Sequence, residues 1–211
     1  MKLGLKEKLF LFSVNQETGI IRNRAQFNSL IFYSSLFDLA RMGSLTIENG
    51  HWHFREMLFD DPVLDKVLNM LLSKQGQKTQ WVLSRIPFQT GSLFRLQVDR
   101  MKSQKLIQVR DITFLGMRLG YRFRVMKPGL LKADLLQLER TLVYGRKPDT
   151  ELLLLIMLLG VSRQHKRLFS GSEIKKRVHR RYRELRNTPA HPRPETYRVI
   201  FKKLRETLRA N

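Results

Sequence analysis

The sequence predicts a mainly α-helical bundle with one apolar central helix and two β-hairpins. Three observations lead to this fold class: most segments repeat apolar residues at helical spacing, residues 152–159 are apolar on every side, and only two segments carry hairpin signals. With 211 residues, of which 42% are apolar, the chain can bury a sizeable core. We therefore expect residues 1–211 to form a single domain that ends in basic helices over residues 171–211.

The first elements are two helices and a hairpin. Apolar side chains recur every three or four positions over residues 3–14 and 25–42, so each segment predicts a buried helix. Gly43 follows the last apolar position and allows a left-handed helix end. Asn49-Gly50 is the dipeptide favoured in two-residue hairpin turns, which predicts a hairpin directly after the second helix.

Three helices and a second hairpin are expected next. Asp61-Pro62 supplies an N-cap and a first-turn proline, which start a helix. A short helix over residues 80–86 and another around Phe94 follow. Residues 106–125 alternate as two strands, with a connection at either Gly116 or Asp111.

The remainder of the chain is expected to be helical. An apolar stripe predicts one helix, and its members recur at intervals of four, three and four: Leu131, Leu135, Leu138 and Leu142. The central apolar helix begins at Pro148-Asp149, and two amphipathic basic helices complete the chain.

Charge indicates the class of partner. The chain has 40 Lys and Arg against 18 Asp and Glu, a formal charge of +22, and residues 163–211 alone hold 16 basic and 4 acidic side chains. Such a surface attracts polyanions, so anionic membranes and nucleic acids are the partner classes to weigh against an ordinary solvated helix face. No cysteine is present, which excludes disulfides and thiolate metal sites.

The residues of an enzyme are not recognisable. None of the five histidines lies in a metalloprotease frame or beside a nucleophile, and His51 with His53 has no further ligand at a known spacing. We expect no catalytic activity, no metal site and no cofactor. The longest apolar run is too short for a transmembrane helix and no signal peptide is evident, so a cytoplasmic location is expected.

The order of several motifs resembles one family. Leu39-Ala40-Arg41-Met42-Gly43 is followed by the hairpin, by Asp61-Pro62-Val63-Leu64-Asp65, by Trp81, and by Lys147-Pro148-Asp149 before the apolar block. Together they resemble the Golgi phosphoprotein 3 family over roughly residues 3–170. The resemblance implies a peripheral membrane protein that binds anionic phospholipid head groups and, like eukaryotic members, holds cytosolic tails of membrane proteins.

The family binds phosphatidylinositol 4-phosphate in a pocket formed by a Trp and an Arg before the Leu-Ala helix and by basic residues on the helix after the second hairpin. Counted without gaps, the family's Trp falls on Asn23 and its Arg on Phe32, so neither the Trp nor the Arg is kept in this chain. The resemblance instead implies head-group binding by the cations beside these positions: Arg22, Arg24, Lys127 and Lys132. Each of them can equally be an ordinary solvated charge.

The first hairpin of the family aids membrane insertion or self-association. Trp52 and Phe54 are its expected membrane contacts here, because amphipathic aromatic rings favour the level of the head groups. The alternative is that Trp52 packs on the bundle, and formation of a homo-oligomer also stays open. A competing function is nucleic-acid binding by the helix and hairpin over residues 92–124 and by the basic C-terminal helices.

Overall fold

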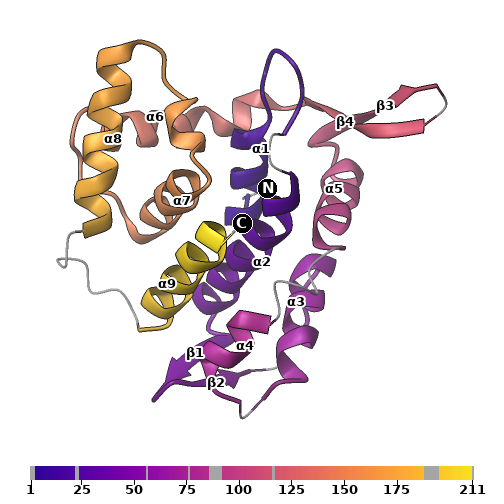
Figure 1. The fold of residues 1–211 in the computed structure, drawn as a ribbon, viewed down its shortest axis with the longest axis vertical. Coiled ribbons are helices and arrows are strands. Elements are labelled where there is room, and N and C mark those ends of the chain that lie inside the picture. The colour runs from indigo at the N-terminus through magenta and orange to yellow at the C-terminus, as the bar shows by residue number, and fades with distance from the viewer. Residues whose placement is uncertain are drawn as a thin grey trace. The chain divides into compact units, whose positions relative to one another are not determined.

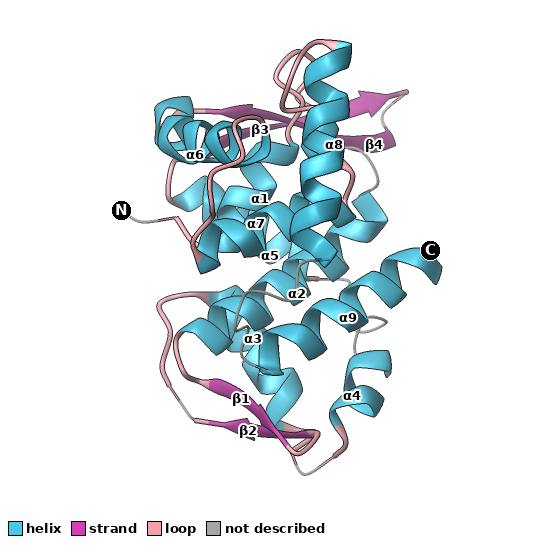
Figure 2. Ribbon diagram, turned by 90° about the vertical axis from the view of Figure 1, so that its left-hand side faces the viewer, coloured by secondary structure: helices cyan, strands magenta, loops and turns pink. Residues whose placement is uncertain are grey.

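The computed structural model describes residues 3–21, 24–55, 57–75, 77–85, 92–115, 117–187 and 195–210. Within these ranges the chain forms nine α-helices and two separate antiparallel β-hairpins, which confirms the predicted mainly α class (Figure 1). Figure 2 shows how far helices outweigh strands. The expectation of a single domain stays a prediction, and contacts group the chain into two compact units.

Unit 1 consists of Met1–Leu3, Glu7–Arg24 and Val98–Asn187, and unit 2 of Gly4–Lys6, Ala25–Gln97 and Thr188–Asn211. The elements follow one another in this order: α1 Leu5–Ser13, α2 Arg24–Arg41, β1 Leu45–Glu48, β2 His51–Phe54, α3 Pro62–Leu72, α4 Thr79–Arg85, α5 Leu93–Ser103, β3 Ile107–Phe114, β4 Met117–Val125, α6 Lys132–Leu142, α7 Thr150–Val161, α8 Ser172–Asn187 and α9 Glu195–Ala210. Two short 3-10 helices, η2 Pro128–Leu131 and η3 Gln164–Lys166, precede α6 and follow α7.

In unit 2 the predicted helix end and hairpin turn are confirmed. Gly43 has a φ of +75°, and the N–H of Ser44 donates to the carbonyl of Leu39 at 3.0 Å, so the end of α2 is hydrogen-bonded. Asn49 and Gly50 both have positive φ, 53° and 76°, as a two-residue turn of mirror-image type requires. This turn sets the pairing of β1 with β2.

The predicted start of α3 in unit 2 is also confirmed. The Asp61 carboxylate accepts hydrogen bonds from the backbone N–H groups of Val63 at 3.0 Å and Leu64 at 3.3 Å. The other oxygen of that carboxylate lies 2.5 Å from the Lys6 ammonium, which is almost completely buried. One aspartate therefore caps a helix and neutralises a buried lysine.

In unit 1 the apolar helix α7 is buried along its length, from Leu153 to Gly160, as the sequence predicts. Gly160 lies against the ring of Tyr182 on α8, where a side chain would overlap the ring. At the other end of α7, Lys8 donates to Glu151 at 2.8 Å and to Asp134 of α6 at 2.7 Å. This ion triad ties α1 to α6 and α7.

The predicted apolar stripe is buried at three of its four positions. Leu131, Leu138 and Leu142 are buried, but Leu135 is 39% exposed. Leu131 belongs to η2 and is the N-cap of α6, so the spacing from Leu131 to Leu135 does not run along one α-helix. Leu135, Leu138 and Leu142 all lie within α6 at intervals of three and four, so they share one face, and Leu135 is its more exposed member.

Candidate functional site

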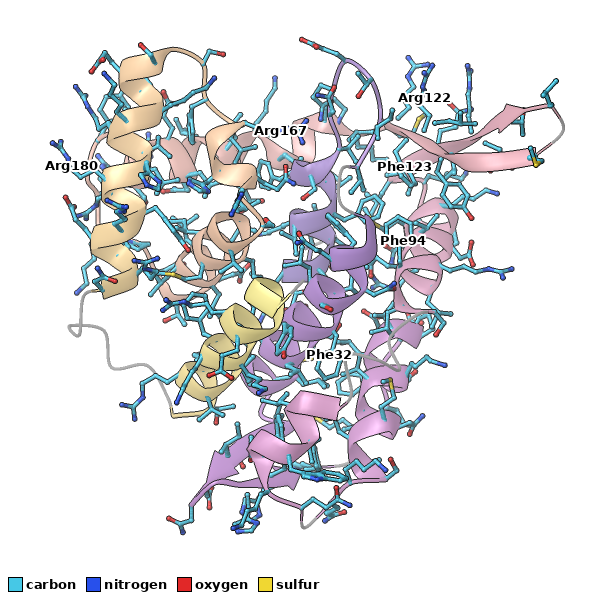
Figure 3. The ribbon with its side chains drawn as sticks, viewed as in Figure 1. Phe32, Phe94, Arg122, Phe123, Arg167 and Arg180 are labelled. Carbon is cyan, nitrogen blue, oxygen red and sulfur yellow. The ribbon has the colours of Figure 1, made fainter. Side chains whose placement is uncertain are left out.

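The β3–β4 hairpin of unit 1 has one buried and one charged face. Phe123 is buried and meets the ring of Phe10 edge-on at 5.3 Å, while its neighbour Arg122 is exposed. Figure 3 shows these two side chains on opposite sides of the β4 ribbon. Side chains two apart on a strand share a face, so Arg122, Arg124 and the opposed Arg110 share the exposed one.

Arg110, Arg122 and Arg124, named here the arginine face, have no acidic neighbour within ion-pair distance among the described residues. Arg110 and Arg122 are direct cross-strand partners. Like charges placed directly opposite destabilise a sheet by up to about 1 kcal/mol. The arginine face is therefore a place where a bound anion would relieve repulsion.

A loop of residues 15–19 closes one side of this face. The N–H of Phe123 donates to the carbonyl of Gly19 at 2.7 Å, which fixes the loop to β4. Gly19 has a φ of +69°, and a side chain there would overlap Arg122, so glycine permits the close approach. A cavity of about 390 Å³, named here the arginine pocket, lies between the loop and the arginine face, with Glu17 as its acidic lining residue.

The tip of the hairpin is apolar and exposed. Leu115 is 82% exposed and Met117 is 62% exposed, and in Figure 1 this end of the hairpin extends beyond the helices of unit 1. Gly116, one of the two positions considered for the turn, lies outside the described residues. Asp111, the other position considered for the turn, lies inside β3.

The structure describes two of the four predicted head-group residues. Arg22 and the side chain of Arg24 lie outside the described residues. Lys127 and Lys132 are both exposed, directly before and after η2. Neither lysine lines the arginine pocket. Head-group binding by these four cations stays a prediction.

Trp52 packs within unit 2. It is 2% exposed and stacks on Phe54, which is half-buried, with 5.9 Å between ring centroids. This burial agrees with the alternative that Trp52 packs on the bundle. To contact a bilayer, Trp52 would first have to leave its neighbours. Membrane contact by the β1–β2 hairpin stays a prediction.

Sequence reasoning missed the loop of residues 15–19 and the tip residues Leu115 and Met117 as parts of a site. The sequence does carry a signal for the arginine face: Arg122 and Arg124 are two residues apart, which places both on one face of a regular strand. Nothing in the local sequence indicates that Gly19 reaches β4, because that contact spans about one hundred residues.

Comparison with known families decides the kinship. A sequence model of Golgi phosphoprotein 3, GPP34, matches residues 5–203. The chain belongs to the Golgi phosphoprotein 3 family. The match confirms the resemblance and extends it past residue 170, through α8 and into α9.

The Golgi phosphoprotein 3 family is not a known enzyme family. A search of curated proteins found no match to this chain. Within the described ranges, no helix has both the length and the apolar character needed to cross a bilayer.

Proposed function

We propose that this protein binds membranes peripherally, without catalysing a reaction, by placing the β3–β4 hairpin against anionic phospholipid. The observation that carries the proposal is an exposed apolar tip, Leu115 and Met117, on the same hairpin as the arginine face. An apolar end with cations behind it matches the order of layers in a leaflet, where the acyl region lies beneath phosphate groups.

The dimensions of the hairpin fit a leaflet. Arg110 precedes Leu115 by five residues, which at about 3.3 Å per residue places it about 17 Å behind the tip. A tip inserted by about 5 to 10 Å would leave Arg110 and its partner Arg122 about 7 to 12 Å above the hydrocarbon boundary. That height is within the head-group layer or about one Debye length of it.

The expected strength is that of a reversible association. Each arginine near an anionic leaflet contributes about 1 kcal/mol, and burial of the tip leucine adds about 2 kcal/mol. Lys127 and Lys132 add similar small amounts if they face the same surface. A sum of about 5 to 7 kcal/mol corresponds to dissociation constants between millimolar and micromolar.

We expect a preference for negative charge rather than for one phosphoinositide. The position that carries the family's Arg is Phe32, which is completely buried in unit 2 (Figure 3) and cannot touch a head group. The adaptor role of eukaryotic members, which hold cytosolic tails, and self-association are further proposals that rest on family membership alone.

The test is flotation of the full chain with phosphatidylcholine vesicles, with or without phosphatidylglycerol, at physiological salt. We expect flotation only with the anionic vesicles. Leu115→Asp and Arg122→Glu should each lower the bound fraction severalfold, because one removes the apolar insertion and the other reverses a cation of the arginine face.

The matched control is Arg180→Glu on α8, since Arg180 is an exposed arginine of unit 1 outside the hairpin (Figure 3). Equal losses for Arg122→Glu and Arg180→Glu would mean that only bulk charge matters. A chain that ignores anionic vesicles but retards duplex DNA at the same salt would favour the nucleic-acid function instead.

A further inference from the structure

Unit 1 has a second hollow, and most of the residues that line it are apolar. It has a volume of about 400 Å³. The end of α1 forms one wall, and η2 with the start of α6 forms another; the apolar residues of these walls are Leu11, Phe12, Val14, Pro128, Leu131 and Leu135. We name it the apolar groove. It explains why Leu135 is exposed in a stripe that is otherwise buried.

The apolar groove and the arginine pocket share a wall. Residues 14–17 and Val125 line both hollows, so the loop that covers the arginines on one side borders aliphatic side chains on the other. The two hollows therefore lie on either side of the same loop, with cations in one and an uncharged lining over most of the other. This arrangement matches a molecule with an anionic end and a hydrocarbon end.

We propose that these two hollows together bind one single-chain anionic phospholipid, a lysophospholipid. Its phosphate lies at Arg110, Arg122 and Arg124, and its acyl chain lies in the apolar groove. The inference rests on the proposed function, since it assigns a defined ligand to the same arginine face. It goes further, because attraction to a charged leaflet needs no apolar groove.

Charges beside the shared wall set the selectivity. Glu17 lines both hollows and is exposed, so it opposes a phosphate. Arg167 lines the groove, and its guanidinium donates to the side-chain oxygen of Gln164 at 3.1 Å, which holds a further cation at the groove. Cations outnumber Glu17 at the combined site, so we expect an anionic head group to be preferred over a zwitterionic one.

The neighbouring residues Leu135 and Leu136 of α6 offer a matched pair. They are 39% and 45% exposed, and of the two only Leu135 lines the groove. An aspartate at either position remains in contact with water, so both variants should fold. Circular dichroism and the melting temperature check this directly.

The experiment measures binding to the full chain by isothermal titration calorimetry. The probes are lauroyl lysophosphatidylglycerol below its micelle concentration, lauroyl lysophosphatidylcholine, and glycerol phosphate. We expect saturable binding of one anionic lysolipid per chain, at least tenfold weaker binding of the zwitterionic one, and at least a hundredfold weaker binding of glycerol phosphate, because it lacks the chain. Leu135→Asp should weaken lysophosphatidylglycerol binding at least tenfold, Leu136→Asp by less than twofold, and Glu17→Gln should strengthen it.

Three outcomes would overturn the proposal: equal affinity for the two lysolipids, equal affinity for glycerol phosphate and lysophosphatidylglycerol, or equal losses in Leu135→Asp and Leu136→Asp. Vesicle flotation separates this failure from failure of the proposed function. A chain that floats with anionic vesicles yet shows one of these outcomes keeps its membrane function and lacks the lipid site. A chain that binds the lysolipid as expected but never floats keeps the site and loses the membrane function.

Discussion

Replacing Lys8 with methionine tests the buried ion triad that Lys8 forms with Asp134 and Glu151. The Lys8 side chain is 11% exposed, and it donates to Asp134 at 2.7 Å and to Glu151 at 2.8 Å. Net hydrogen bonds to charged groups contribute about 1.5 to 3 kcal/mol each, and burial of the ammonium opposes them. The variant leaves two carboxylates that are each about one-fifth exposed and can partly rehydrate. We therefore expect Lys8→Met to lower the free energy of unfolding by about 2 to 4 kcal/mol at pH 7.

The effect should depend on pH in one direction. Burial lowers the pKa of Lys8, but the hydrogen bonds and charges of Asp134 and Glu151 outweigh burial and raise the pKa above its ordinary value of 10.5. The folded state then keeps the proton to higher pH than the unfolded chain does. The stabilisation is fully present below the unfolded pKa and is lost as the pH rises through the raised folded pKa. The difference between wild type and Lys8→Met should be constant from pH 7 to 9 and shrink above about pH 10.5.

Urea unfolding followed by circular dichroism measures both quantities. The control is Lys176→Met, because Lys176 lies 2.7 Å from Glu173 with both side chains mostly exposed. It has the same separation as the pair of Lys8 with Asp134 and should change stability by less than about 0.5 kcal/mol. If the two variants lose equal stability, or if the loss in Lys8→Met grows above pH 10, the reasoning from burial is refuted.

Three further predictions concern packing, capping and ionisation. Gly160→Ala places a methyl group into the Tyr182 ring and should cost about 2 kcal/mol, with partial recovery when Tyr182→Leu is added, as thermal unfolding would show. Asp61→Asn and Asp61→Ala both remove the charge beside Lys6, but only Asp61→Asn keeps an oxygen for the α3 cap. Asp61→Ala should therefore be less stable than Asp61→Asn by about 1 kcal/mol in urea unfolding. Equal losses of stability in the two variants would exclude a contribution from the cap. Burial raises the pKa of Tyr197 above its ordinary value of 10.0; the charge of Arg41 opposes this rise and that of Asp38 adds to it. In a titration followed by phenolate absorbance, the signal that Tyr197→Phe lacks should therefore appear at a pH above 10.0.

Most of the fold was predictable because its boundaries are set by local chemistry. The cap at Asp61, the left-handed end at Gly43 and the turn at Asn49 and Gly50 each need only their own backbone and side chains, and all three are confirmed. Leu135 repeats at helical spacing with Leu138 and Leu142, but it is 39% exposed because it lines a hollow, and spacing alone does not show how far a face is covered. The division into two units follows from contacts between distant segments, which periodicity does not encode.

The site was less predictable because it depends on register. Continued without a break from the pairing of Arg110 with Arg122, the register would pair Arg118 with Phe114, but it shifts after Ile112 and pairs Arg118 with Thr113. A count by alternation therefore fails across the irregularity. The approach of residues 15–19 to β4 is likewise a long-range contact. The head-group role of Lys127 and Lys132 rests on family resemblance and stays a prediction.

The arginine face and the apolar groove both cost stability in the isolated protein. Arg110 and Arg122 repel each other across the hairpin, and Leu135 exposes aliphatic surface that a repacked α6 could bury. Natural chains keep such local conflicts mainly where a ligand or partner resolves them. An anion alone relieves only the repulsion, and an apolar partner alone relieves only the exposure. One anionic amphiphile placed around the loop of residues 15–19 relieves both, so the coexistence of the two defects in one unit favours a lipid over separate ligands.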